Sequence, residues 1–142
     1  MPYLLGIDIG TSRAKAVLID LDGNLLGVAG KDYAIDQPQA GWAEQDPEAW
    51  WRAATLAVRQ ALAVAGAAPG GVVAIGLAGQ MHGAVLLLPD GRPARAAIIW
   101  PDRRSPAQVE RATRAVGLTR LGRLTGNRLA VGMAAASLLW LR

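Results

Sequence analysis

Three short segments of this chain combine side chains that could do chemistry. The first covers residues 6–12, with sequence GIDIGTS, where a carboxylate and a glycine turn follow an apolar run. Backbone N–H groups in such a turn attract phosphate oxygens, and here the turn contains Gly10, Thr11 and Ser12. Asp8 at a strand end could hold Mg²⁺, which binds few carboxylates and keeps its waters. An ordinary hairpin with an Asx turn is an equally good explanation. The segment does not match a Walker A phosphate loop, which requires a lysine.

The second segment covers residues 76–83, with sequence GLAGQMHG, and contains the only histidine of the chain. Its glycines would let a ligand approach the backbone closely. Gln80 and a neutral His82 can each donate and accept hydrogen bonds, which suits a ligand with many hydroxyl groups. The plainer alternative is that Met81 packs in the core and His82 lies at the surface. A zinc site is excluded, because the chain has neither a second histidine nor a cysteine.

The third segment covers residues 100–104, with sequence WPDRR. Asp102 could accept hydrogen bonds from hydroxyl groups, and Trp100 could stack on a sugar ring or line its pocket. The alternative is a surface ion pair between Asp102 and Arg103, which would add little stability.

Strand and turn signals place the first segment in a β-meander. Apolar runs at residues 3–7, 14–19 and 25–35 predict three strands. The turn at residues 10–12 joins the first two, and the Asp-Gly pair at residues 22–23 is a strong hairpin signal between the second and third. The three strands are therefore expected to pair antiparallel.

A helix is predicted to begin near Asp46, which can cap it, with Pro47 in its first turn. Glycine and proline signals after residue 65 predict its end. Its apolar residues recur at spacings of three and four, and are Trp50, Ala54, Ala57, Val58, Ala61, Leu62 and Ala65. Core packing and covering of the sheet are expected for Trp50 and Trp51.

The rest of the chain mixes strand and helix signals. Strands are expected at residues 72–78, 83–88 and 96–100, the first of them central in its sheet. Helices are expected at residues 107–116, 118–124 and 133–142. This mixed order predicts an α/β fold.

Composition narrows the class of protein. The 142 residues are 52% hydrophobic and 18% charged, which excludes disorder for most of the chain and predicts one modest domain. The absence of cysteine excludes a disulfide scaffold and a thiol nucleophile, and it fits a reducing cytoplasm. The apolar N-terminal run breaks at Asp8 and has no basic residue before it, so it is neither a signal peptide nor a membrane span.

Charge is unevenly distributed. Residues 1–90 carry five basic and nine acidic groups, whereas residues 91–142 carry ten arginines and two acidic groups. A basic part can bind nucleic acid or a phosphorylated ligand, or it can simply face solvent. No recognition helix, zinc motif or aromatic RNA-binding motif accompanies these arginines. The arginines of the predicted helices, at positions 111, 114, 120 and 123, are therefore expected to face solvent or a missing lobe.

Five segments together, in their order and spacing, resemble the N-terminal part of the FGGY carbohydrate kinases and, within that family, its xylulokinase branch. These segments are residues 6–12, 42–51, 79–83, 99–104 and 125–127. The resemblance spans essentially the whole chain, and the Gln-Met-His-Gly sequence is its most specific piece. Glycerol kinases of this family look different there, with an arginine and an acidic residue at the positions of Met81 and His82.

The resemblance implies a ribonuclease-H-like, actin-like α/β fold in which residues 1–142 form the N-terminal lobe, a mixed sheet with a three-strand meander plus helices. It implies ATP-dependent phosphorylation of a ketopentose, D-xylulose, to its 5-phosphate, with ATP and Mg²⁺ as cofactors. By position, Asp8 would face the phosphates and Mg²⁺ together with Gly10, Thr11 and Ser12. Met81 and His82 would contact the sugar, and the residues lining or supporting its pocket would be Gln80, Trp100, Asp102 and Arg103.

The resemblance also implies partners. The family's catalytic base is an aspartate of the second lobe, so residues 1–142 alone are expected to lack kinase activity. Expected partners are the sugar and that second lobe, with no nucleic acid and no membrane, in the cytoplasm. Exposed apolar residues at 138–141 would favour a homodimer. The alternatives are a non-catalytic sugar-binding regulatory module of the same fold and a basic nucleic-acid-binding domain.

Overall fold

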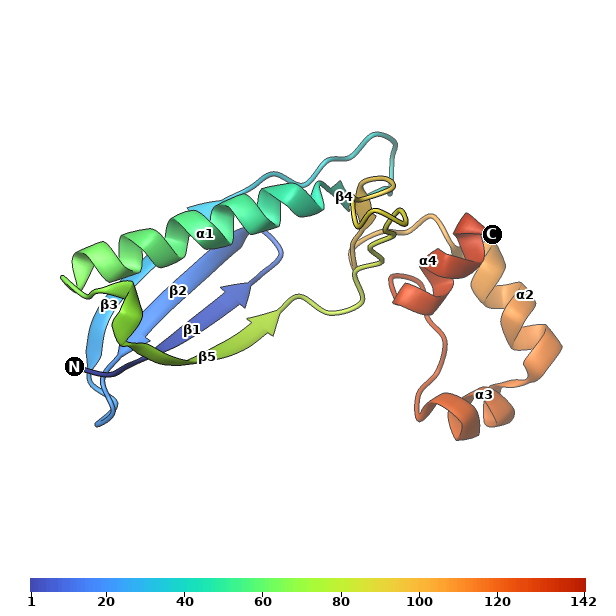
Figure 1. Ribbon diagram of the computed structural model, residues 1–142. Helices are drawn as coiled ribbons and strands as arrows, with labels where there is room; N and C mark the ends of the chain where they lie inside the picture. The colour runs from blue at the N-terminus through green and yellow to red at the C-terminus, as the bar shows by residue number, and fades with distance from the viewer. The chain divides into compact units, whose positions relative to one another are not determined.

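The computed structural model describes residues 1–142, which form two compact units. The first unit contains Met1–Ile35 and Pro47–Gln80, and the second contains Asp36–Asp46 and Met81–Arg142. Figure 1 labels most of the elements. Each unit therefore combines segments that are distant in sequence.

The first unit is built on a four-stranded sheet with the order β3-β2-β1-β5 (Figure 1). Its strands are β1 (Tyr3–Ile9), β2 (Arg13–Ile19), β3 (Leu25–Asp32) and β5 (Val72–Gly79). β1 and β3 both pair antiparallel with β2, so the predicted meander is confirmed. The β2–β3 hairpin turns at Gly23, whose φ of 86° favours glycine. Asp20 stabilises this turn by accepting hydrogen bonds from the N–H groups of Asp22 and Asn24.

The strand predicted at residues 72–78 is present as β5, but the expectation that it is central is wrong. β5 lies at the edge of the sheet, and its only partner is β1, with which it runs parallel. The segments predicted as the next strands, residues 83–88 and 96–100, belong to the second unit. A β-rich apolar run indicates a strand, but it does not tell which neighbours that strand has.

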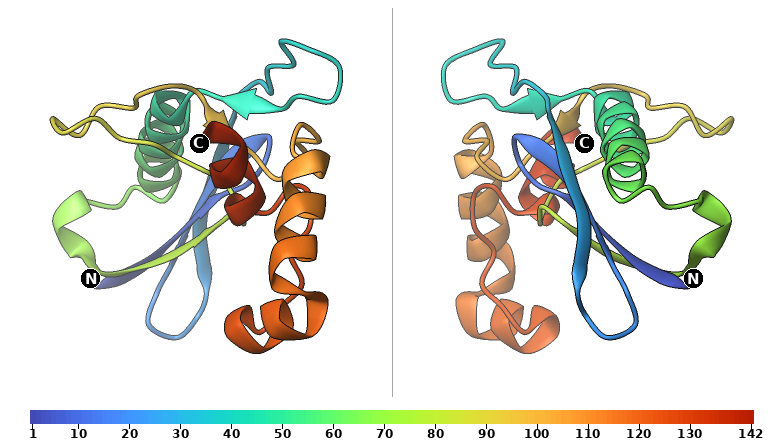
Figure 2. Two further views of the ribbon diagram at one scale, coloured as in Figure 1. Left: turned by 90° about the vertical axis from the view of Figure 1, so that its right-hand side faces the viewer. Right: turned by 90° about the vertical axis from the view of Figure 1, so that its left-hand side faces the viewer.

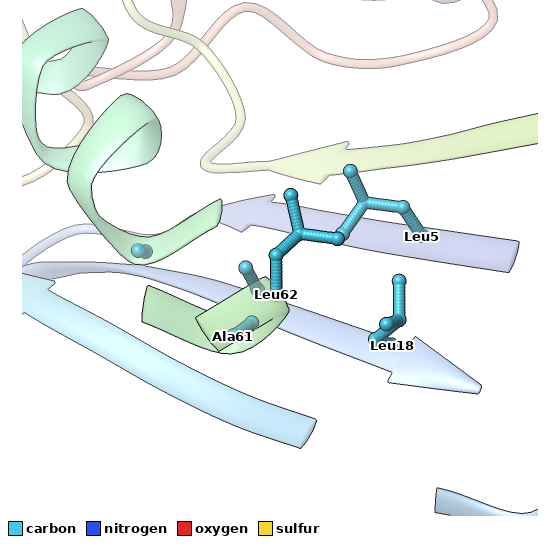
Figure 3. Close-up of a cluster of buried hydrophobic side chains, with 6 residues drawn as sticks. Leu5, Leu18, Ala61 and Leu62 are labelled. Atoms are coloured by element: carbon cyan, nitrogen blue, oxygen red, sulfur yellow. The ribbon is translucent and has the colours of Figure 1, made fainter. Parts of the chain in front are cut away.

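Helix α1 (Pro47–Val64) packs along one face of this sheet (Figures 1 and 2). The residues buried between helix and sheet are Leu5, Ala16, Leu18, Ala57, Ala61 and Leu62 (Figure 3). Gly27 of β3 allows the helix to lie close, because a Cβ at this position would lie 2.4 Å from the carbonyl oxygen of Ala61. The predicted alanine-rich face is therefore the face that α1 buries.

α1 ends where the glycine and proline signals predict. Gly66 adopts a left-handed φ of 61°, and Pro69 begins the short 3-10 helix Pro69–Gly71 before β5. Within α1, Trp50 is partly buried, whereas Trp51 is 71% exposed. The expectation that both tryptophans cover the sheet is therefore wrong for Trp51. Consecutive helical residues point about 100° apart, so one packed face does not hold both.

The second unit holds a two-stranded ladder and three helices. β4 (Glu44–Gln45) pairs antiparallel with β6 (Ala97–Ile98). The helices are α2 (Pro106–Val116), α3 (Leu118–Thr125) and α4 (Ala134–Leu141), close to their predicted bounds. Each helix of the structure is too short or too polar to cross a lipid bilayer.

The strand predicted at residues 83–88 is wrong, and the strand predicted at 96–100 is confirmed only for Ala97–Ile98. Instead of full strands, these segments form two isolated β-bridges, which pair Ala84 with Ile98 and Leu87 with Pro93. Pro93 has no N–H group to donate to a ladder, so the pairing does not extend there.

Replacing Leu18 by alanine tests the core beneath α1. Leu18 is fully buried, so Leu18→Ala removes apolar contacts and leaves a cavity; we expect the free energy of unfolding of this unit to fall by about 2–5 kcal/mol. Leu25→Ala, at an exposed position of β3, should change it by less than about 1 kcal/mol. Amide hydrogen exchange in α1 over a urea series measures both. Equal losses in the two variants would contradict this account of the core.

Candidate functional site

The first candidate cluster surrounds Asp8, near the carboxyl end of β1. The antiparallel register puts Asp8 opposite Lys15 of β2, and Lys15 Nζ lies 4.0 Å from a carboxylate oxygen of Asp8. Both side chains are partly exposed, so this ion pair contributes little stability. The Asp8 carboxylate therefore remains accessible to a ligand or a hydrated cation.

The turn after β1 is fixed by hydrogen bonds on both sides. The N–H of Gly10 donates to the carbonyl oxygen of Arg13 at 3.0 Å. The N–H of Tyr33 donates to the carbonyl oxygen of Ser12 at 3.1 Å, and the Tyr33 hydroxyl donates to that of Gly10. A Cβ at Gly10 would lie only 3.1 Å from the Arg13 oxygen, so the tight turn favours glycine. The backbone at residues 10–12 is thus held in one shape by its own protein.

Tyr33 is a residue of this cluster that the sequence did not indicate. Burial raises its pKa, and the negative charge of Asp8 raises that pKa further. The phenol therefore stays protonated and continues to donate to the turn. Tyr33 lies far from Gly10 in sequence, and only the β2–β3 pairing, which ends with Arg13 opposite Asp32, brings it there. The available sequence signal was an aromatic residue, Tyr33, directly after the third strand of the meander.

The composition of this cluster fits phosphate and Mg²⁺. Thr11 is partly exposed and Ser12 is exposed beside the turn backbone. Mg²⁺ is usually held by one or two carboxylates together with waters and phosphate oxygens, and Asp8 supplies one carboxylate. No group of three acidic or histidine side chains forms a metal cage anywhere in residues 1–142. Asp8 therefore fits a cation held mainly by its waters and by a phosphorylated ligand.

The second candidate cluster surrounds His82, in the second unit. His82 is the only residue other than glycine with a positive φ, 59°. A left-handed backbone costs energy for such a residue, and such strain is concentrated at functional sites. Met81 beside it is 68% exposed, so the alternative is wrong in placing Met81 in the core, but its surface position for His82 is confirmed, because His82 is exposed. The chain is fixed just beyond, where the N–H of Ala84 donates to the carbonyl oxygen of Ile98 at 2.9 Å.

His82 lines a cavity of about 760 Å³, a size typical of small-molecule sites. Its walls come from α2, α3, α4 and the loop between the last two. The other polar side chains that line it are Thr125, Asn127, Arg128 and Arg142. The apolar ones include Val116, Leu121, Leu138 and Leu139. The cavity thus combines a few hydrogen-bonding groups with an apolar floor, as sites for small organic ligands do.

The residues predicted to contact or support a sugar do not all line this cavity. Among Met81, His82, Trp100, Asp102 and Arg103, only His82 does so. Arg103 is exposed, and its N–H donates to the carbonyl oxygen of Gly41 at 2.7 Å. Gln80 lies at the end of the first unit, where its N–H donates to the carbonyl oxygen of Ile9 at 2.8 Å.

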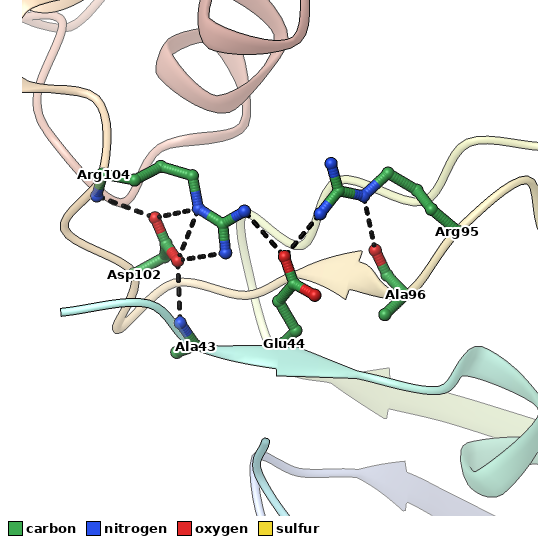
Figure 4. A network of polar contacts seen from close by, with 6 residues as sticks. All are labelled: Ala43, Glu44, Arg95, Ala96, Asp102 and Arg104. Atoms are coloured by element: carbon green, nitrogen blue, oxygen red, sulfur yellow. Dashed lines mark hydrogen bonds and ion pairs between the residues drawn. The ribbon is translucent and has the colours of Figure 1, made fainter. Parts of the chain in front are cut away.

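Asp102 is buried in a polar network (Figure 4). One carboxylate oxygen accepts hydrogen bonds from the N–H of Ala43 and from a terminal nitrogen of Arg104, both at 2.7 Å. The other accepts hydrogen bonds from the N–H and Nε of Arg104, both at 2.9 Å. The surface pair considered between Asp102 and Arg103 is wrong, because the partner is Arg104. Of the two roles expected for Asp102, lining or supporting a pocket, this burial fits support.

Arg104 is the centre of this network. Its guanidinium is 1% exposed and pairs with Glu44 at 2.6 Å; Glu44 also pairs with Arg95. The same guanidinium lies 3.6 Å from the ring centroid of Trp42 and 4.9 Å from that of Trp140. The two indole rings meet edge to face at 5.3 Å. Two carboxylates and two aromatic faces therefore stabilise one buried cation.

Burial by itself raises the pKa of Asp102 and lowers the pKa of Arg104, because it penalises the charged forms. The hydrogen bonds and opposite charges outweigh burial. The pKa of Asp102 therefore lies below its ordinary value, and the pKa of Arg104 lies above its own. Both groups are charged at neutral pH.

Comparisons with known proteins agree on one family. The family that matches residues 3–142 is described as the FGGY family of carbohydrate kinases, N-terminal domain. The chain is 34% identical over its whole length to the xylulose kinase of Bacillus subtilis (strain 168), of which it covers 28%. It is 39% identical, over 99% of its length, to the glycerol kinase of Thermus brockianus, of which it covers 29%.

A solved structure, the xyloylose kinase from Brucella ovis, matches 98% of this chain with a TM-score of 0.88 and 36% identity, over 29% of its own length. These matches confirm the family resemblance and the actin-like α/β fold class that the motifs imply. The chain spans under a third of the length of the curated relatives it matches. Xylulose and glycerol kinases match at comparable identity, so similarity alone does not fix the substrate.

Asp102→Asn tests the buried network. Removing one charge of a buried pair costs about 3 kcal/mol, and we expect that loss at pH 7 in the opening free energy of the Ala43 amide, measured by hydrogen exchange. A carboxylate whose pKa is lowered by folding stabilises the folded state at every pH above its unfolded pKa. This stabilisation is lost as the pH falls from the unfolded pKa through the folded one. The difference between wild type and variant should therefore shrink below about pH 3.9.

The matched control is Asp90→Asn, which removes an exposed carboxylate that also pairs with an arginine two residues later. It should leave the exchange of the Ala43 amide unchanged. A difference between wild type and Asp102→Asn that stayed constant from pH 7 to pH 2 would contradict the assignment of a charged Asp102.

Proposed function

This chain belongs to the FGGY family of carbohydrate kinases, and we propose that it supplies the N-terminal part of an ATP-dependent kinase that converts D-xylulose to D-xylulose 5-phosphate. The observation that carries the proposal is His82, a strained residue on the wall of a ligand-sized cavity. Glycerol kinases of the family have an arginine and an acidic residue at the positions of Met81 and His82, as the family resemblance implies. Met81 and His82 therefore favour a ketopentose over glycerol.

On the sugar side, His82 and Asn127 provide donors and acceptors for hydroxyl groups. Met81 and Trp100 are exposed but do not line the cavity, and they keep the roles that the family resemblance implies for them. In this proposal Asp102 acts indirectly, through the segment that carries Trp100. Gln80 and Arg103 keep the supporting roles that the family resemblance implies.

On the nucleotide side, Asp8 would hold Mg²⁺ and the turn at Gly10, Thr11 and Ser12 would bind the phosphates of ATP. Tyr33 holds this turn rigid by donating to Gly10, so the turn needs little rearrangement when phosphate binds. When bound, Mg²⁺ would neutralise charge on the transferred phosphoryl group. Asp8 would hold the hydrated cation, and Lys15 lies within reach of the same carboxylate.

The proposal predicts sugar binding by this chain. D-xylulose should bind more tightly than glycerol in isothermal titration calorimetry. His82→Gly removes the imidazole and tolerates the positive φ, and we expect it to weaken D-xylulose binding about tenfold through the lost hydrogen bond. Leu124→Ala, exposed on α3 and not a lining residue of the cavity, is the control and should bind as wild type does. Tighter binding of glycerol than of D-xylulose would overturn the proposed substrate.

The proposal also predicts that the 142 residues alone do not catalyse phosphoryl transfer from ATP to D-xylulose. The family's catalytic base belongs to the second lobe, and phosphoryl transfer needs the attacking hydroxyl and the γ-phosphate to be oriented together. We expect no sugar-dependent release of ADP when the purified chain is incubated with ATP, Mg²⁺ and D-xylulose in a coupled assay. A complete xylulose kinase serves as the positive control. Release of ADP that increases with D-xylulose concentration would show that this chain carries a base of its own.

A further inference from the structure

We propose that Arg104 is a positioning residue that fixes helix α4 and thereby sets the shape of the cavity lined by His82. The proposal rests on the proposed function of that cavity as a sugar site. It assigns a functional role to a buried charge that touches no part of the cavity itself.

Arg104 joins three segments of the second unit. It stacks on Trp42, which lies just before β4, and it pairs with Glu44 in β4. It pairs with Asp102 on its own segment. It also lies against Trp140, close to the end of α4. A shift of any of these segments would therefore weaken contacts made by the same guanidinium.

α4 is the element of this set that faces the cavity. Ala134, Ala135, Leu138 and Leu139 of α4 line the cavity, and Trp140 follows directly after the last of them. A rotation of α4 that moved Trp140 away from Arg104 would also move Leu138 and Leu139. The contact between Arg104 and Trp140 therefore fixes the position of the cavity wall.

The backbone just before α4 also lies close to the segment at residues 100–104 that carries Arg104. A Cβ at Gly132 would lie 2.3 Å from the carbonyl oxygen of Trp100, and Gly132 has a left-handed φ of 85°. Only glycine allows the backbone before α4 to approach so closely. Residues 100–104 thus lie against the chain near both ends of α4, beside Gly132 just before its start and against Trp140 close to its end.

The arginine side chain is well suited to this task. A planar guanidinium can bind two carboxylates along its edge while its face lies on aromatic rings. A lysine ammonium is a point charge and cannot serve these partners in one plane. Arg104→Lys therefore keeps the charge but loses the geometry that fixes Trp140.

The test measures α4 and sugar binding in the same variants. We expect Arg104→Lys to weaken D-xylulose binding about tenfold, because a small displacement of a cavity wall costs affinity. Amide hydrogen exchange should accelerate in residues 134–141 and stay unchanged in α2. The matched control is Arg92→Lys, since Arg92 also pairs with an aspartate two residues earlier but on the surface. This control should change neither readout.

Two outcomes overturn the proposal: D-xylulose binding by Arg104→Lys within twofold of wild type, or unchanged exchange in α4. If Arg104→Lys unfolds the unit, Trp140→Leu decides instead: it removes the ring that Arg104, Arg95 and Trp42 contact and leaves both ion pairs of Arg104 in place. Faster exchange in α4 with weaker D-xylulose binding would support the proposal, and no change in either would overturn it. A wild-type chain that binds no D-xylulose would refute the proposed substrate. The exchange measurement would then still decide whether Arg104 fixes α4.

Discussion

The guanidinium of Arg104 is taken almost entirely out of water, a transfer that costs several kcal/mol for an unpaired ion. Asp102 and Glu44 offset that cost only while both hydrogen-bond to it. The apolar core of the second unit, which contains Arg104, is small. Its buried hydrophobic residues are mostly alanines, and the largest are Ile98 and Ile99. The arrangement of β4, the segment at residues 100–104 and α4 therefore depends on the completeness of this polar network.

The first unit relies on a different kind of interaction. Its helix and sheet approach closely because small residues meet at the interface, and Gly27 leaves room for the helix backbone. Its candidate binding turn, residues 10–12, has carbonyl oxygens that accept hydrogen bonds from Tyr33. Tyr33 remains a neutral donor beside a carboxylate, so the turn keeps its shape across the physiological pH range. Rigid packing and a preformed turn together suit a site that receives a highly charged ligand.

Local signals in the sequence predicted the meander, α1 and the three helices of the second unit, because each depends on periodicity, caps and turn residues within a short window. The failures involve distant partners. The edge position of β5 depends on which segment lies beyond it, and the length of β6 depends on pairing with β4. For the candidate site, Asp8 and His82 were predicted from their motifs. The partnership of Asp102 with Arg104, and the presence of Tyr33 at the turn, required the three-dimensional arrangement.

The open edge of β5 bears on how this chain behaves at high concentration. Val72–Gly79 contains no charged residue and no proline, and Ile75 and Leu77 are exposed. At the opposite edge of the sheet, β3 ends in Lys31 and Asp32, charges of the kind that discourage one strand edge from recruiting another. β5 lacks that protection, so concentrated solutions should scatter light increasingly with time. A lysine at Leu77 is the simplest remedy for crystallisation or spectroscopy.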